Sequence, residues 1–457
     1  MILHRPLTAD ERRVSQKNYG LYNFVNGASY LCLGENVLIL FATRLEAPNA
    51  VVALLGSMLF LGYLLLPLGV ARTAKVGAAI SQADFWVCRN IAALLTAAAA
   101  PAAWFLPDHL PLAWGMVLLG AFLFYGCRAA GCVLSTPLVG DFSTREEAPL
   151  VIGRAQALFY SSGVVMIVVV TLLTKQFPGL WSLAGIIVFG ACCGVTSSTF
   201  LRNIHETGAL QDAARAPLLP GIPAAFRNPD LRRLTVGWFG LSLGKLLLVP
   251  LSILAVKRGC GFSDSAALLC AVALTVGNCL ISQGSGPVCQ RLGPRKLLLL
   301  AFGANFLALA LWLLLPADAS PALAWCAIVP LFFALGGIDT AGVNACNSYF
   351  LMVCPDKSKQ VSGAISLNLV TGAGAGLLGA ALGPWLIHRS ETWAPSCGAF
   401  FQGPLGPFRL YFALLFPILL VFLFAILRMR TVLYEFRERH GDEEVARAAH
   451  LGRHSRH

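Results

Sequence analysis

The sequence predicts an all-α membrane protein in which twelve transmembrane helices form two pseudo-symmetric six-helix bundles. Hydrophobic residues make up 57% of the 457 residues and charged residues only 12%, with a mean hydropathy of +0.71. A soluble domain carries about 25% charged residues. The apolar residues gather in stretches of roughly 20, the length that a helix needs to cross about 30 Å of hydrocarbon. Because lipid offers no partner to backbone amides, such stretches must cross as helices.

A polar, proline-containing segment divides the apolar stretches into two groups of six. We expect an N-terminal bundle over residues 20–202 and a C-terminal bundle over residues 234–431, joined by a middle loop at 203–233 and flanked by tails at 1–19 and 432–457. The predicted spans are 20–43, 50–71, 86–106, 112–138, 152–174, 179–201, 234–256, 265–286, 297–315, 321–348, 361–387 and 408–428.

The basic residues predict the orientation of these spans. Of the 34 Lys and Arg residues, 25 fall in the two tails, the middle loop and the loops after even-numbered spans. Lys and Arg concentrate in cytoplasmic loops, so both termini are expected in the cytoplasm, which requires an even number of crossings. We expect a bacterial inner (plasma) membrane. Dispersed loop charges also explain the net charge of +12 without a nucleic-acid partner.

The two halves carry matching segments at a nearly fixed offset. Residues 31–35 (Leu-Cys-Leu-Gly-Glu) match residues 241–245, which lie 210 positions on, and residues 126–131 match 337–342, which lie 211 positions on. Repeated halves related by an axis along the membrane normal place a binding site at their interface near the midplane.

The same alignment isolates four ionisable residues deep in predicted spans: Glu35, Arg128, Lys245 and Asp339. Each costs at least about 2.5–3.5 kcal/mol near the bilayer centre, so each needs a partner or water. We interpret them as the lining of a polar cavity. Arg128 and Lys245 would bind an anionic or polar substrate group, and Glu35 or Asp339 would take up a coupling proton. The alternative is a set of ion pairs that only hold helices in register.

Uncharged polar residues lie at similar depth. Five of them are candidates for substrate contact, although hydrogen bonds between helices explain such residues equally well: Asn26, Asn36, Tyr160, Asn344 and Asn368. Asp84 and Arg89, at the predicted start of the third span, are interpreted as an ion pair at the membrane edge.

The segment 286–296 (Gly-Pro-Val-Cys-Gln-Arg-Leu-Gly-Pro-Arg-Lys) lies between the eighth and ninth spans. It resembles the loop signature of the major facilitator superfamily, with Gly286, Arg291, Gly293 and Arg295 at its motif positions. Gln290 stands where the family usually has Asp. The resemblance implies that spans 1, 4, 7 and 10 surround a central cavity and that the halves rock by alternating access. Those are the four spans with the deep charges.

We therefore expect a secondary active transporter that moves a small organic solute, coupled to protons, as a monomer in contact with membrane lipid. We expect no enzyme activity, metal or cofactor, and the chain has no Walker-type phosphate loop. Two alternatives stay open. A translocase of lipids or other amphiphiles would have a cavity open sideways to the bilayer. A non-transporting sensor or assembly partner would have fully paired deep charges and no accessible cavity.

Overall fold

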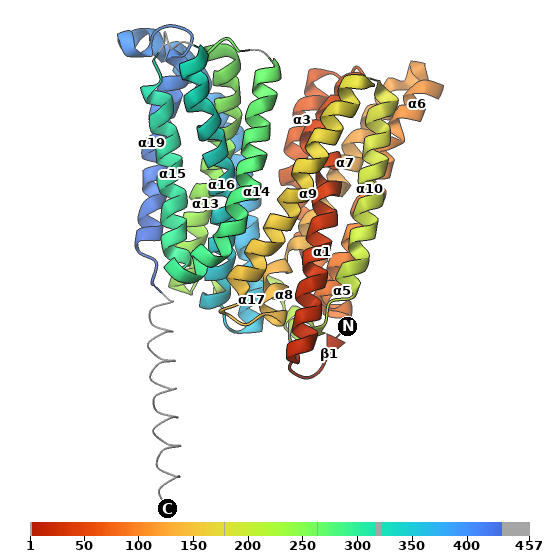
Figure 1. The fold of residues 1–457 in the computed structure, drawn as a ribbon. Helices are drawn as coiled ribbons and strands as arrows, with labels where there is room; N and C mark the ends of the chain where they lie inside the picture. Colours follow the sequence, from red (N-terminus) through yellow and green to blue (C-terminus); the bar gives the residue numbers. More distant parts are fainter. Residues whose placement is uncertain (1, 178, 263, 317–320, 432–457) are drawn as a thin grey trace, which may run out of the picture.

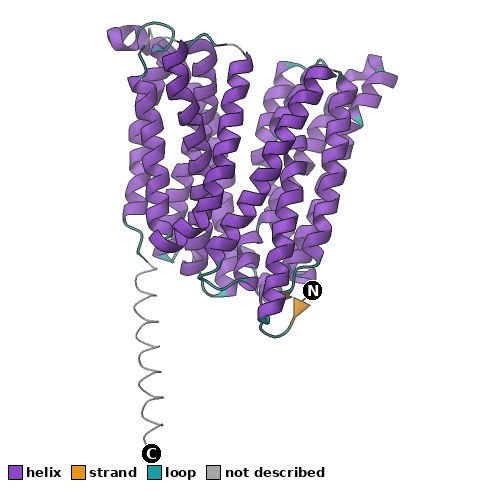
Figure 2. Cartoon of the chain, in the orientation of Figure 1, coloured by secondary structure: helices purple, strands orange, loops and turns teal. Residues whose placement is uncertain are grey.

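Each predicted span forms a helix in the computed structural model, which describes residues 2–177, 179–262, 264–316 and 321–431. Eleven helical segments in this part of the chain are long and apolar enough to cross a membrane. The 29-residue α14 (Asp264–Leu292) completes the predicted twelve. Figure 2 shows that helices make up nearly the whole described chain. The fold is therefore the expected pair of six-helix bundles.

Four of the first six spans consist of more than one helical element, and the fifth and sixth are single helices. The six spans are α1 (Ala9–Leu33) with α2 (Glu35–Arg44), α3 (Asn49–Leu61) with the 3-10 turn η1 (Gly62–Leu65) and α4 (Leu66–Val76), α5 (Ala78–Ala97) with α6 (Ala99–Phe105), the 3-10 turn η2 (Pro107–His109) with α7 (Leu110–Cys132) and α8 (Ser135–Phe142), α9 (Ala148–Gln176), and α10 (Leu180–Arg202). Gly34 has extended backbone (φ −68°, ψ 166°), and this breaks the first span directly before Glu35.

Five of the last six spans carry a proline inside a helix. The six spans are α13 (Pro229–Leu254) with the π-helical turn η3 (Ala255–Gly259), α14, α15 (Pro294–Leu314), α16 (Pro321–Val353), α17 (Lys357–Asn368) with the π-helical turn η4 (Leu369–Gly374) and α18 (Ala375–Trp393), and α19 (Gly406–Leu427). Two 3-10 turns, η5 (Ala394–Ser396) and η6 (Ala399–Phe401), precede α19.

The segment between the bundles is more ordered than a polar loop. It holds the strand β2 (Glu206–Thr207) and two short helices, α11 (Ala209–Ala214) and α12 (Leu218–Ala225). Strand β1 (Ile2–Leu3) pairs with β2 in parallel. Both ends of the described chain therefore lie at the same end of the molecule (Figure 1). We call this end, formed by residues 2–8, 203–228 and 428–431, the terminal face.

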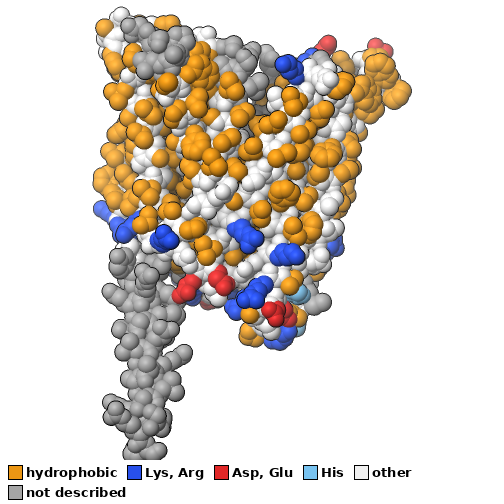
Figure 3. Space-filling model, viewed as in Figure 1, with side chains coloured by type: hydrophobic (Ala, Val, Ile, Leu, Met, Phe, Trp, Pro, Cys, Tyr) orange, Lys and Arg blue, Asp and Glu red, His pale blue; other side chains and the backbone are white. Residues whose placement is uncertain are grey.

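The flanks of the molecule are apolar. Figure 3 shows hydrophobic side chains over the middle and upper parts of one flank, with most of the visible Lys and Arg gathered towards the terminal face. Leu64, Val165 and Leu377 are 69%, 61% and 62% exposed. Soluble monomers rarely expose apolar patches of this extent. The apolar band is therefore the surface that faces lipid.

The two halves touch most closely near the terminal face. Helices α9 and α14 approach each other there and diverge towards the opposite end (Figure 1). Polar contacts join the halves at the same level: Thr136 to Asn347 (3.1 Å), Asn344 to the Pro149 carbonyl (3.2 Å), Gln290 to the Glu146 carbonyl (3.3 Å), and the Lys357–Asp141 ion pair (3.2 Å). These contacts close the interface at the terminal face.

Candidate functional site

A cavity of about 950 Å³ lies between the two halves, above the contacts that close the terminal face. Its walls include residues of α7, α13 and α16, the helices that carry Arg128, Lys245 and Asp339, together with residues of α1, α5, α9, α14 and η4. Ligand pockets for small molecules measure roughly 300–1,000 Å³. The cavity is therefore large enough for a metabolite-sized solute.

Two of the predicted deep charges form an ion pair on the second-half wall. Lys245 Nζ of α13 lies 2.6 Å from Asp339 Oδ2 of α16. The Lys245 side chain is 51% exposed and that of Asp339 is 18% exposed, so the pair faces the cavity. Tyr160 of α9 lies within electrostatic range of Asp339 from the opposite half. The pair is accessible to a solute, which a purely structural pair would not need to be.

The third deep charge, Arg128, lies on the first-half wall among tyrosines. Its guanidinium carbon is 5.4 Å from the centroid of the Tyr30 ring. Tyr63 lies within electrostatic range of both Arg128 and Lys245. Tyr63 also packs on Gly372 of η4, where a Cβ atom would lie 2.2 Å from the tyrosine Cζ. Tyr63 thus bridges the first-half wall and the second half.

Arg89 also lines the cavity, and the predicted Asp84–Arg89 ion pair is wrong. Asp84 instead accepts from Arg72 (2.6 Å) and from Arg202 (2.8 Å) near the terminal face. The reason is the start of α5, which lies at Ala78, eight residues before the predicted span. Arg89 is therefore three turns into the helix rather than at the membrane edge.

The environment of Arg89 is closed and polar on one side. The side chain is fully buried, and its Nη2 donates to Asn26 Oδ1 (3.1 Å) and Ser29 Oγ (3.2 Å). Its guanidinium carbon lies 4.6 Å from the Trp86 ring centroid and 4.9 Å from that of Phe124. The sequence signal was the spacing of Gln82, Trp86 and Arg89, which places three polar or aromatic residues on one helical face.

The structure distributes the uncharged candidates unevenly. Asn26, Tyr160 and Asn368 line the cavity. Asn344 does not: it is fully buried and donates to the Pro149 carbonyl (3.2 Å) and to Ser285 Oγ (2.9 Å). Asn344 therefore ties the halves together below the cavity. The cavity-lining amides outside this prediction are Asn23, Gln82, Gln156, Asn278 and Asn347.

The side chains of Glu35 and Asn36 lie outside the part of the structure that is described, although both residues belong to the first turn of α2. Their expected roles in proton uptake and substrate contact therefore stay predictions.

The loop motif residues lie at the terminal face, away from the cavity. Gly293 has positive φ (85°) and forms the turn between α14 and α15. Arg295 donates to the Leu427 carbonyl (2.7 Å) and so caps the end of α19, while Arg291 is exposed. Gly286 lies at the crossing of α14 with α9, where a Cβ atom would be 2.9 Å from the Pro149 carbonyl oxygen. Of these motif residues, Gly286 lies at the contact between the two halves, whereas Gly293 and Arg295 make their contacts within the second half.

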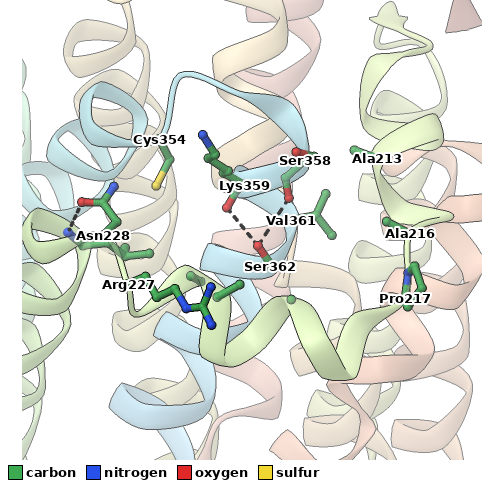
Figure 4. A pocket seen from close by; sticks show the side chains of 14 residues that line it. Ala213, Ala216, Pro217, Arg227, Asn228, Cys354, Ser358, Lys359, Val361 and Ser362 are labelled. Atoms are coloured by element: carbon green, nitrogen blue, oxygen red, sulfur yellow. Dashed lines mark hydrogen bonds between the residues drawn. The ribbon is translucent and has the colours of Figure 1, made fainter.

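A second pocket of about 550 Å³ lies at the terminal face, between the middle segment and α17. Figure 4 shows Ser358 and Ser362 of α17 on one side and Arg227 and Pro217 of the middle segment on the other. This pocket shares no lining residue with the central cavity. It belongs to the region that links the halves rather than to the solute path.

Glu206 of β2 connects the middle segment to the third span. The side chain is fully buried and accepts from the backbone N–H groups of Ala78 (2.8 Å) and Ala79 (3.2 Å) at the start of α5. Burial raises the pKa of the Glu206 carboxyl to about 7, against the lowering effect of these two hydrogen bonds. Gly77 precedes α5 with positive φ (88°), and a Cβ atom there would lie 2.4 Å from Glu206 Oε1.

Comparison with known proteins gives one family and many similar folds. A family model described as Major Facilitator Superfamily matches residues 20–369. No curated protein sequence matches the chain. A solved bacterial homologue of the iron transporter ferroportin, in an outward-facing state, has a TM-score of 0.68 at 14% identity and covers 91% of this chain and 98% of its own.

Two sugar transporters are similarly related in structure. The E. coli fucose:proton symporter has a TM-score of 0.64 at 14% identity, covering 93% of this chain and 99% of its own. The proton:xylose symporter XylE has a TM-score of 0.62 at 14% identity, with coverages of 93% and 97%. At such low identities the likeness shows the fold alone.

Proposed function

The chain belongs to the major facilitator superfamily, and we propose that it is a proton-coupled secondary transporter that moves a small organic solute by alternating access. Family membership makes it a transporter rather than an enzyme. The observation that carries the finer proposal is the Lys245–Asp339 pair, which lies in a cavity between two halves that can part. Buried ion pairs that only held helices together would not need to face such a cavity.

Alternating access requires the contacts at the terminal face to break while the opposite end closes. The contacts that must break are the polar contacts between the halves and the crossing of α9 with α14. Gln290 and Lys357 each hold a group of the first half through one hydrogen bond or ion pair. The halves can therefore separate by a rocking motion without unfolding any helix, and this exposes the cavity to the other side of the membrane.

Asp339 is the group that we assign to proton coupling. Its ion-pair partner is Lys245 on α13 (2.6 Å), and the phenol of Tyr160 on α9 lies within electrostatic range of it. While Lys245 stays close, its positive charge balances the negative charge of the Asp339 carboxylate. If Lys245 turns towards a bound solute, the Asp339 side chain is left in the cavity without its cation, and we propose that a proton takes the place of that cation. Binding of solute and proton would then be linked through one ion pair.

The remaining parts of the proposal concern placement. We infer that the terminal face lies in the cytoplasm, because the Lys and Arg residues of the even-numbered loops gather there. We infer a bacterial inner membrane, a monomer surrounded by lipid, and rigid halves close to residues 20–202 and 234–431 with residues 203–233 as the joint.

The proposal can be tested in two steps. Purified full-length protein is first screened by thermal shift against a metabolite library at pH 5.5 and 7.5, and stabilising compounds are then measured in proteoliposomes. We expect uptake driven by a pH gradient for wild type. In Asp339→Asn, gradient-driven uptake should disappear while exchange of solute across the membrane without a gradient is retained.

Asp10→Asn is the matched control, because Asp10 is an acidic residue that is 92% exposed at the start of α1. It should behave as wild type in both assays. Equal gradient-driven uptake by Asp339→Asn and wild type would reject the assigned coupling role. Absence of both stabilisation and uptake across the library would reject the proposed transport of a small organic solute.

A further inference from the structure

The two walls of the central cavity differ in charge. Among the described side chains that line it, the first-half wall contributes Arg89 and Arg128 and no carboxylate, whereas the second-half wall contributes the balanced pair Lys245 and Asp339. The side chain of Glu35 lies outside the part of the structure that is described. The described lining therefore carries an excess of two positive charges, and both belong to the same wall.

Arg89 has hydrogen-bonding capacity that its neighbours do not use. Its Nη2 is bonded to Asn26 and Ser29, but its Nε and Nη1 are buried and have no partner among the described residues. Buried polar groups are almost always hydrogen-bonded, and a buried charge needs compensation. Stacking on Trp86 and Phe124 offsets only part of that cost.

The position of Arg128 increases the need for a compensating negative charge. Arg128 lies within electrostatic range of Arg89, and the two like charges repel. Arg128 is half-buried, so its guanidinium can meet a solute directly, while Arg89 lies deeper behind Asn26. A bound anion at Arg128 would offset the repulsion between the two arginines.

Aromatic rings surround this positive site. The aromatic residues that line the first-half wall are Tyr19, Tyr22, Tyr30, Tyr63, Trp86, Phe159 and Tyr160. Arg128 lies against the Tyr30 ring, and Tyr30 in turn packs against Phe159 with ring centroids 5.7 Å apart. Aromatic faces favour stacking on flat, unsaturated groups. The wall thus combines an anion site with surfaces that suit a planar body.

We propose that the substrate is a small organic carboxylate with a planar, unsaturated body, held on the first-half wall. Its carboxylate meets Arg128, which offers paired N–H donors in the geometry that carboxylates prefer. Arg89 acts as a positioning residue, which orients Asn26 and adds its charge from behind. This inference rests on the proposed function. In it the two walls have different roles: the first-half wall binds the substrate, and Asp339 on the second-half wall binds the proton.

Four probes of similar size test the inference on the full chain in lipid nanodiscs at pH 7.5. They are indole-3-acetate (planar anion), indole-3-acetamide (planar neutral), tryptamine (planar cation) and cyclohexaneacetate (non-planar anion). We expect indole-3-acetate to bind at least tenfold more tightly than the amide or the non-planar anion, and tryptamine to bind least. Tightest binding of the amide or tryptamine, equal binding of the two anions, or no binding by any probe would overturn the inference.

Variants separate substrate contact from general stability. Arg128→Gln should lose at least tenfold in affinity for indole-3-acetate, while Arg128→Lys should recover part of the loss. Arg13→Gln is the control, because this arginine is 81% exposed at the terminal face. Unchanged affinity in Arg128→Gln would contradict the assignment. The ranking of probes on wild type keeps the test decisive even where a variant fails to fold.

The role of Arg89 is tested by a split in kinetic parameters. In proteoliposomes, Arg89→Lys should raise KM with little change in the pH dependence of uptake, whereas Asp339→Asn should abolish gradient-driven uptake. A merely structural Arg89 would lower the amount of active protein and leave KM unchanged. Gradient-driven uptake of a neutral or cationic solute would refute this inference and leave the proposed function standing. Anion binding without any uptake would support this inference and refute the proposed transport function.

Discussion

Substitution of Gly286 by Ala should open the terminal face. Gly286 lies where α14 crosses α9, and a Cβ atom added there would lie 2.9 Å from the Pro149 carbonyl oxygen and 3.1 Å from Leu150 Cα. Both atoms belong to the backbone, so no side-chain rotation can relieve the contact. The crossing is tight from both sides, because a Cβ atom on Gly153 would lie 2.8 Å from the Gly286 nitrogen. The helices must move apart.

The size of the population shift follows from the steric cost of the added Cβ atom, which applies to only one of the two conformations. Overpacking of a close contact costs about 1–3 kcal/mol. The cost falls on the conformation in which α9 and α14 touch at the terminal face and is absent when the halves part there. A difference of 1–3 kcal/mol changes the ratio of two states by about 5–150-fold. Gly286→Ala should therefore convert a small population that is open at the terminal face into a large one.

Spin labels on the two halves can measure this shift. Cysteines replace Glu146 and Arg291, which are both exposed at the terminal face on opposite halves. The background has its exposed cysteines changed to serine, namely Cys88, Cys192, Cys326 and Cys397. Pulsed electron paramagnetic resonance should give one short distance for the parent protein and a second, longer distance for Gly286→Ala.

Gly284→Ala is the matched control, two residues earlier on the same helix, where an added Cβ atom meets nothing within 4 Å. It gains the same helix propensity as the test variant without the clash. The reasoning fails if Gly286→Ala keeps the single short distance. It also fails if both variants show the same longer distance, since the change would then come from helix propensity rather than from the crossing.

Three further predictions concern the terminal face. Lys357→Gln leaves the Asp141 carboxylate buried without its cation. This single variant should therefore have a lower unfolding midpoint than the double variant Lys357→Gln with Asp141→Asn. The pKa of Glu206 is raised from 4.5 to about 7, so the folded protein holds a proton that the unfolded chain has lost. Stability should therefore fall by about 3 kcal/mol as pH rises through this window, and Glu206→Gln should flatten that fall in unfolding measured from pH 4.5 to 8. Arg295→Gln removes the cap on the Leu427 carbonyl and should cost about 1–3 kcal/mol, seen as a lower unfolding midpoint; no change would mean that water replaces the cap.

The number of spans was predictable because lipid imposes a strict length and polarity on every crossing. The ends of the spans were not, because helices continue beyond the hydrocarbon until a local signal stops them. Gly77 is such a signal: its positive φ ends one helix and lets α5 begin at Ala78. Missing it displaced the predicted start of the third span by eight residues and moved Arg89 from the cavity to the membrane edge.

The location of a site residue was predictable where every other environment would cost it a large free energy. A charge in the middle of a span must face a cavity or a partner, and Arg128, Lys245 and Asp339 do line the cavity. A neutral amide is satisfied equally by solvent, substrate or a neighbouring helix. Asn344 and Asn347 lie three positions apart on α16, yet Asn344 ties the halves together and Asn347 lines the cavity. Helical periodicity alone could not assign those two roles.

The internal repeat also explains why the two cavity walls can differ in chemistry within one symmetric fold. Thr136 and Asn347 are joined by a hydrogen bond and lie 211 positions apart, the offset that relates the halves. Equivalent residues can touch only where the axis relating the halves passes between them, so the axis runs through this contact. The same offset carries Arg128 onto Asp339. Because those two positions have opposite charges, a solute on the axis meets a cation on one side and an acid on the other. A rocking motion about a symmetric scaffold can therefore couple two different partners, an anion and a proton.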